Sequence, residues 1–167
     1  LGRVWRWLAT VCAQALSLHL PYLPLDITMP ADLTALIGCP VAAIDTPALV
    51  VDLDAMQRNL ERMQSFATQH GMRLRPHAKM HKSAALALRQ MQAGAVGVCV
   101  QKPSEAAAMV AGGVRNVYVS NEVVSLSKCE LLAQLNRGLA AQNGQISVAV
   151  DSLLGVQRIA QAMATHG

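Results

Sequence analysis

This sequence is short of aromatic side chains, and it lacks acidic ones over a long internal stretch. Aromatic residues make up 3% of the 167 positions, and only Phe66 and Tyr118 occur after residue 28. A core with so few aromatics must consist of Ala, Val, Leu, Ile and Met, which favours helices and parallel strands over a β-sandwich. Charged residues amount to 14% and hydrophobic ones to 53%, a balance typical of a globular domain rather than a disordered chain.

Common signatures of metal and nucleotide binding are also missing. The four cysteines are widely spaced and form no CxxC pair, so neither a zinc knuckle nor a disulfide framework is indicated. Reduced thiols in the cytoplasm are the simpler interpretation. No GxGxxG follows an expected strand and no GxxxxGK[ST] occurs, so the usual dinucleotide and triphosphate cradles are not indicated.

Neither the net charge of +4 nor the N-terminal segment indicates a nucleic-acid or membrane partner. No block of lysine and arginine alternates with aromatics, as a nucleic-acid surface would require. The segment 1–28 has two arginines and an apolar stretch, like a weak export signal. Gln14, His19 and two prolines make it too polar and broken to span a membrane. Because Met29 opens an ordinary protein start, we interpret 1–28 as a mis-set start or irrelevant extension in preference to an export signal.

From residue 48 onward, short apolar runs alternate with helical patterns. The runs begin at intervals of roughly 20 to 30 residues, which is the size of a β/α unit. Asp54 is expected to cap the first helix, and Gly71 to end it. Strands are expected at residues 48–53, 73–79, 95–101, 116–120 and 145–151, each followed by a helix.

A run of β/α units fits either an open doubly wound sheet or a closed (β/α)8 barrel. Four units from residue 72 would make half of a barrel and leave two unpaired sheet edges. We therefore expect an incomplete chain in three parts. They are the extension 1–28, an N-terminal segment 29–71 with one strand and one helix, and four β/α units in 72–167.

The stretch "RLRPHAKMHKS", residues 73–83, concentrates positive charge without an acidic neighbour in the sequence. The nearest acids are Glu61 and Glu105. Side chains alternate along a strand, so the basic residues at odd positions from 73 to 79 would share one face. Lys79 would then lie at the C-terminal tip of the strand.

The C-terminal tips of strands carry the chemistry of β/α proteins. A lysine there, near other cations and without a carboxylate partner, loses its proton more easily and becomes a nucleophile toward carbonyls. The same charge would also suit a ligand that carries phosphate or carboxylate. A solvated strand end without function is the third interpretation, and the residues alone leave all three open.

Four segments together resemble a known family. The sequence resembles the D-threonine aldolase and D-serine dehydratase family, in particular its 3-hydroxy-D-aspartate aldolases and D-threonine aldolases. Members of this family share the alanine racemase N-terminal domain. The segments are, in order, "DTPALVVDLDAMQRNLERM", "RLRPHAKMHKS", "GAVGVCVQKPSEAAAM" and "VSNEVV".

The resemblance implies an α/β fold, namely the first half of a (β/α)8 TIM-type barrel that binds pyridoxal 5′-phosphate. In this alignment of motifs, Lys79 matches the lysine to which the cofactor is attached. The strand at 48–53 would belong to a separate β-domain assembled from both chain ends, and the barrel would begin with the strand at 73–79.

The resemblance also implies an enzyme, a pyridoxal-phosphate-dependent lyase. It would cleave D-threonine or 3-hydroxy-D-aspartate to glycine and an aldehyde. Four alternatives remain: a dehydratase of D-serine or 3-hydroxyaspartate, an amino-acid racemase, a non-catalytic protein that binds the cofactor, and a truncated, inactive gene product.

Beside Lys79, two residues are expected at the cofactor. His77 lies two residues before the lysine on the same strand face, and Gln101 follows the strand at 95–101. Cys99, in the middle of that strand, is expected to pack in the core. Weaker candidates, each at or just past a strand end, are His81, Lys82, Asn121 and Asp151.

The remaining expectations also come from the resemblance. A divalent metal (Mn, Mg or Zn) is expected only in a full-length protein, with ligands outside these 167 residues. The partner is a small D-3-hydroxy amino acid, with no nucleic acid and no membrane. A full-length protein is expected to be a homodimer in the cytoplasm.

Overall fold

The computed structural model describes residues 33–166, which fall into two units. The first unit runs to Asn59 and the second begins at Leu60. The expectations for the segment 1–28 lie outside the described residues.

The first unit has little regular structure before α2 (Leu53–Gln69). It holds two 3-10 turns, η1 (Leu33–Leu36) and η2 (Val41–Ala43). The strand expected at 48–53 is not formed, because residues 48–52 carry no regular structure and Leu53 opens α2. A strand is stable only beside a partner, and residues 33–59 contain none. The assignment of 48–53 to a separate β-domain stays a prediction.

The N-cap of α2 lies two residues earlier in the sequence than expected. Asp52, not Asp54, closes the N-terminus: its Oδ1 accepts the Ala55 N–H at 2.9 Å, and its carbonyl accepts the Met56 N–H at 2.9 Å. Asp54 lies in the first turn, where its negative charge interacts favourably with the positive end of the helix dipole. Gly71 follows the end of the helix as expected, with a φ of +66° that suits glycine.

The second unit alternates helices with parallel strands, which confirms the expected α/β class. After α2 its elements are α3 (Ala84–Gln92), β1 (Val98–Val100), α4 (Pro103–Ala111), β2 (Asn116–Val119), α5 (Leu126–Ala140), β3 (Gln145–Val148) and α6 (Leu153–His166). No helix within residues 33–166 combines the length and the apolar character needed to cross a membrane.

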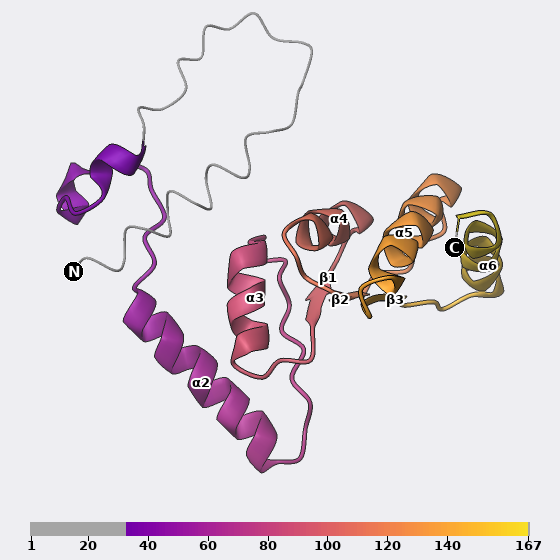
Figure 1. The fold of residues 1–167 in the computed structure, drawn as a ribbon, viewed down its shortest axis with the longest axis horizontal. Coiled ribbons are helices and arrows are strands. Elements are labelled where there is room, and N and C mark those ends of the chain that lie inside the picture. Colours follow the sequence, from indigo (N-terminus) through magenta and orange to yellow (C-terminus); the bar gives the residue numbers. More distant parts are fainter. Residues whose placement is uncertain (1–32, 167) are drawn as a thin grey trace, which may run out of the picture. The chain divides into compact units, whose positions relative to one another are not determined.

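The strand order agrees with the barrel, one of the two architectures that the sequence left open. The sheet runs β1-β2-β3 in chain order, and the parallel bridge of His77 places the segment before β1 beside it, so four consecutive segments lie side by side. The common doubly wound orders place only three consecutive strands side by side before the switch point. Along the sheet each helix from α3 to α6 contacts the next, α4 packs on β1 and β2, and α5 packs on β3 (Figure 1). The helices therefore cover one face, as in part of a singly wound barrel.

The strand expected at 73–79 is reduced to a single parallel bridge between His77 and Cys99. Cys99 donates its N–H to the Pro76 carbonyl at 2.8 Å, and Ala78 donates its N–H to the Cys99 carbonyl at 2.8 Å. Pro76 has no N–H, so one rung of the ladder is missing and no continuous strand forms. The segment nevertheless lies alongside β1 in parallel.

The core lies between the sheet and the helices. Val98 pairs with Val117, and Val100 pairs with Val119. All four valines are fully buried, together with Met109 of α4. These branched side chains were expected in strands, and the helices exclude water from them.

The opposite face of the sheet, called here the inner face, is more polar. One row across it consists of His77, Cys99, Tyr118 and Ser147, which are linked by the bridge and the strand register. Tyr118 is half-buried and Ser147 is exposed, so the described part of the chain does not cover this face. Barrel interiors are filled by such layers of inward-facing side chains.

A second row lies nearer the amino ends of the strands. The Arg75 Nη1 donates to the Asn116 Oδ1 at 2.8 Å. This pair passes beside Gly97, where an added Cβ would stand 2.5 Å from the Arg75 Nη1 and 2.5 Å from the Asn116 carbonyl oxygen. The absence of a side chain at Gly97 therefore makes room for the arginine.

Replacing Gly97 by alanine should destabilise the fold. The new methyl group would overlap both the arginine and a backbone carbonyl, and we expect the free energy of unfolding to fall by about 1–3 kcal/mol. The control is Gly138→Ala in α5, where nothing lies within 4 Å of the new Cβ. That change should raise the free energy by about 0.5–1 kcal/mol. Urea unfolding measures both, and equal effects would contradict this account.

Candidate active site

The candidate site lies at the carboxyl edge of the sheet, in the loop between the His77 bridge and α3. Ala78 is 1% exposed and packs in the core, while the neighbouring Lys79 is exposed. This is the alternation that the sequence predicts for adjacent residues. Lys79 therefore follows directly on an anchored residue, with its amine accessible.

Lys79 has no ion-pair partner within residues 33–166. The cation three positions later, Lys82, differs: its Nζ lies 3.5 Å from the Glu105 Oε1. Of the two lysines in this loop, Lys79 is the one left without a carboxylate.

His77 contacts both the lysine backbone and the end of a neighbouring strand. Its Nδ1 accepts the Lys79 N–H at 3.2 Å, and its Nε2 lies 3.5 Å from the Ser120 Oγ. The Ser120 hydroxyl donates to the Val100 carbonyl at 3.2 Å. The structure thus brings the His77 ring to the backbone of Lys79.

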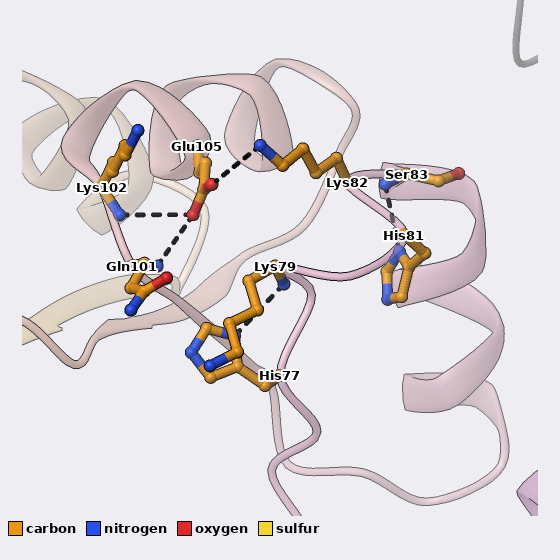
Figure 2. Close-up of polar contacts among 8 residues, drawn as sticks. All are labelled: His77, Lys79, His81, Lys82, Ser83, Gln101, Lys102 and Glu105. Atoms are coloured by element: carbon orange, nitrogen blue, oxygen red, sulfur yellow. Dashed lines mark hydrogen bonds and ion pairs between the residues drawn. The ribbon is translucent and has the colours of Figure 1, made fainter.

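Gln101 follows β1 at the same edge as Lys79 (Figure 2). Its side chain is half-buried, and its backbone N–H donates to the Glu105 Oε2 at 2.9 Å. Asn121 and Asp151 are exposed just past β2 and β3. Asp151 does not cap α6, since the Ser152 Oγ accepts the Gly155 N–H at 3.2 Å.

Glu105 supplies the acid that the basic stretch lacks in the sequence. Its Oε2 accepts the N–H groups of Gln101 and Lys102 at 2.9 and 3.3 Å, and its Oε1 pairs with Lys82 (Figure 2). Burial by itself would raise the pKa of Glu105. The two backbone hydrogen bonds and the charge of Lys82 outweigh burial, so the pKa is lowered.

His81 is half-buried against α3. Its Nδ1 accepts the Ser83 N–H at 3.1 Å, and Ser83 in turn caps α3 through the Leu86 N–H. Burial lowers the pKa of His81, against smaller raising contributions from the Gln90 side chain and the Ser83 backbone. His81 therefore belongs to the packing of the loop rather than to an exposed helix start.

Arg75, which was expected on the same strand face as Lys79, donates to Asn116 at the amino end of β2, away from the candidate edge. Cys99 is a free thiol and, at 8% exposed, is buried as expected, but it lies on the inner face of the sheet rather than in the core between sheet and helices. Cys39 and Cys129 are also free thiols.

Sequence reasoning missed Ser120 and Glu105. Ser120 directly follows the strand 116–119, so its position at a strand tip was the available signal. Glu105 sits at the third position of α4, where a carboxylate commonly accepts the N-cap N–H. Its contact with Lys82 depends on how two separate loops meet, which the sequence does not specify.

Within residues 33–166, no group of three or more His, Cys, Asp or Glu side chains is arranged to hold a metal ion. The candidate site contains one exposed lysine, a neighbouring imidazole, and an amide and a hydroxyl at the ends of two strands.

A protein-family model matches most of this chain. The model for the alanine racemase N-terminal domain matches residues 51–167, which is more than half of the chain. The chain belongs to this family.

Two curated relatives of this alanine racemase N-terminal domain are aldolases. A D-threonine aldolase from Arthrobacter sp is 46% identical over 130 residues, which cover 78% of this chain and 33% of the relative. A 3-hydroxy-D-aspartate aldolase from Paracoccus denitrificans is 42% identical over 137 residues, which cover 81% and 34%. The chain therefore spans about a third of the length of the curated relatives it matches.

A solved structure supports the same grouping. The crystal structure of D-threonine aldolase from Filomicrobium marinum matches 76% of this chain and 33% of its own, with a TM-score of 0.71 and 49% identity. A D-threo-3-hydroxyaspartate dehydratase from Delftia sp. is also similar, at 39% identity over 70% of this chain and 30% of the relative. The expected family and the expected fold are confirmed.

The half-buried His81 should make stability depend on pH. Because its pKa is lowered in the folded state, the unfolded chain takes up the proton first as the pH falls. The free energy of unfolding should therefore decrease from the ordinary histidine pKa of about 6.5 down to the lowered folded value. Urea unfolding at a series of pH values should show a shallower decline in His81→Gln, and parallel curves would contradict the assignment.

The Glu105 cluster should depend more on its backbone hydrogen bonds than on its ion pair. The Lys82 side chain is 65% exposed and that of Glu105 only 13%. We expect Lys82→Met to lower the free energy of unfolding by less than about 0.5 kcal/mol. Glu105→Ala, which leaves two N–H groups without their acceptor, should lower it by about 1–3 kcal/mol. The reverse order would show that the ion pair dominates.

Proposed function

We propose that the intact protein is a pyridoxal-phosphate-dependent lyase that cleaves a D-3-hydroxy amino acid to glycine and an aldehyde. D-Threonine and 3-hydroxy-D-aspartate are the proposed substrates. The observation that carries this proposal is the exposed Lys79 at the carboxyl edge of the sheet, without an ion-pair partner among the described residues. The similarity to two aldolases, over about a third of their length, supports the substrate class.

The residues at the edge fit the cofactor. Pyridoxal phosphate carries an aldehyde, and an aldehyde needs a primary amine that is accessible and able to lose its proton. Lys79 is exposed and has no carboxylate partner within residues 33–166, whereas Lys82 is paired with Glu105. We propose that Lys79 holds the cofactor, with His77 and Gln101 beside it.

The net reaction moves one proton and breaks one carbon–carbon bond. The β-hydroxyl loses its proton, the Cα–Cβ bond breaks, Cβ becomes the aldehyde carbon, and Cα gains a proton to give glycine. The cofactor, when bound, supplies the electron sink that makes Cα a possible leaving group. Lys79 would hold the cofactor through its amine, on a backbone that its neighbours fix, and Gln101 and Ser120 would offer polar groups at the ends of β1 and β2.

A dehydratase reaction is the second candidate, favoured by the similarity to the D-threo-3-hydroxyaspartate dehydratase. In that reaction the β-hydroxyl leaves and the Cα–Cβ bond survives. Glycine is therefore a product only of the aldolase reaction.

Three finer expectations stay predictions. The divalent metal has no ligand set within residues 33–166, so no step is assigned to it on these residues. The homodimer is a prediction for the intact protein. A cytoplasmic location is compatible with the free thiols of Cys39, Cys99 and Cys129.

The attachment site can be tested by trapping. The intact protein with pyridoxal phosphate is reduced with borohydride, digested and mapped. We expect the label on Lys79, its loss in Lys79→Ala and its retention in Lys82→Ala, because Lys82 is paired with Glu105. A label on Lys82 or Lys102, or no label at all, would overturn the proposal.

The reaction is tested with D-threonine and 3-hydroxy-D-aspartate under the same conditions. We expect glycine and an aldehyde in equal amounts, and a loss of at least about a thousandfold in kcat for Lys79→Ala. A keto acid without glycine indicates the dehydratase, and formation of the L-enantiomer indicates a racemase. A labelled Lys79 without turnover indicates a non-catalytic binding protein.

A further inference from the structure

The loop that carries Lys79 contains the same hydrogen bond twice. The Lys79 N–H donates to the His77 Nδ1 at 3.2 Å, and the Ser83 N–H donates to the His81 Nδ1 at 3.1 Å (Figure 2). In both cases an imidazole accepts from the backbone two residues ahead, as an Asx turn does with a carboxylate or amide oxygen. In both turns the histidine stands two residues before the residue whose N–H it accepts, Lys79 in one and Ser83 in the other.

This contact specifies the protonation state of each ring. A backbone N–H can donate only to a nitrogen with a free lone pair, so Nδ1 of His77 and of His81 carries no proton. A neutral imidazole then carries its proton on Nε2. Lysine or arginine at either position would have no acceptor to offer, which explains why histidines interrupt this basic stretch.

The surroundings of the Nε2 atom of His77 agree with this assignment. It lies 3.5 Å from the Ser120 Oγ, whose own hydroxyl proton is directed to the Val100 carbonyl at 3.2 Å. The serine oxygen therefore has a lone pair to offer. The chain of donors runs in one direction from the Lys79 backbone through the imidazole and the serine to β1.

His81 has a complementary neighbour on the other side of the loop. Its Nε2 is buried without a partner within hydrogen-bond distance, and so is the Oε1 of Gln90 on α3. The Gln90 side chain is also close enough to raise the pKa of His81, although burial lowers it more. An N–H on Nε2 matches that amide oxygen, whereas a lone pair on Nε2 would face a second acceptor.

Together the two turns hold the backbone on both sides of Lys79. The Ala78 N–H is bonded to the Cys99 carbonyl, and the Lys82 N–H is bonded to the Ala78 carbonyl, both at 2.8 Å. The imidazoles satisfy the N–H groups of Lys79 and Ser83, which the main chain does not. A lysine on a backbone fixed at these points reaches its target with less conformational entropy to lose.

We infer that His77 and His81 are positioning residues for Lys79, both neutral and protonated on Nε2, each closing one turn of the loop through its Nδ1. The inference concerns the shape of the loop, and its effect on the cofactor rests on the proposed role of Lys79. Neither imidazole is required to touch the reacting atoms.

The first experiment does not need the cofactor. Long-range ¹H–¹⁵N correlation spectra of the ¹⁵N-histidine-labelled protein at neutral pH distinguish the two tautomers. Single histidine replacements assign the signals. We expect the Nε2–H tautomer at both positions, and an Nδ1–H tautomer or a protonated ring at either position would overturn the inference.

The second experiment compares matched variants of each histidine. Asparagine can restore the turn, because its Oδ1 accepts the N–H two residues ahead, whereas leucine cannot. With borohydride trapping as the readout, His77→Asn and His81→Asn should label Lys79 within about threefold of the parent. His77→Leu and His81→Leu should label it about tenfold more slowly, the effect of one lost hydrogen bond.

The outcomes separate the two proposals. Equal labelling of the asparagine and leucine variants, with urea unfolding showing that all are folded, would refute the positioning role. No label on Lys79 in the parent protein would refute the proposed function, and the tautomer spectra would then still decide the shape of the loop.

Discussion

Ala78 connects the loop of Lys79 to the rest of the fold. Its N–H donates to Cys99, its carbonyl accepts from Lys82, and its methyl group is buried in the core. These three restraints act on a single residue, so the position next to it is defined although the Lys79 side chain is exposed. The amine is thus accessible without the backbone being loose.

Glu105 joins two segments that come from different β/α units. Its carboxylate holds the N-terminus of α4 through two backbone N–H groups and holds the loop before α3 through Lys82. Lys82 follows a tight turn and has a φ of 48°, an unusual value for a lysine. The carboxylate therefore pairs with one cation of the basic stretch, and within residues 33–166 Lys79 has no carboxylate partner.

The sequence predicted those features that depend on local pattern. The buried valines of β1 and β2 appear where apolar runs were expected, and the motif around Lys79 indicated the family correctly. The strand at 73–79 was overestimated, because its pattern is strand-like but Pro76 cannot donate to the ladder. The run at 48–53 has a strand composition without a partner in its unit. Composition alone does not reveal whether a partner is present.

Features that depend on contacts between distant residues could not be predicted. Ser120 meets His77 across 43 positions, and Asn116 meets Arg75 across 41. Only the register of parallel strands brings such residues together. The same limit applies to the two imidazole turns, since the spacing is visible in the sequence but the direction of a ring is not.

Gly97 has a consequence for how this segment can vary in evolution. Shortening Arg75 would remove one of the two obstructions at that position, but the Asn116 carbonyl belongs to the main chain and would remain. No compensating side-chain change can make space there. Homologues that keep this strand register should therefore retain glycine at this site even where the arginine and asparagine beside it have both been exchanged.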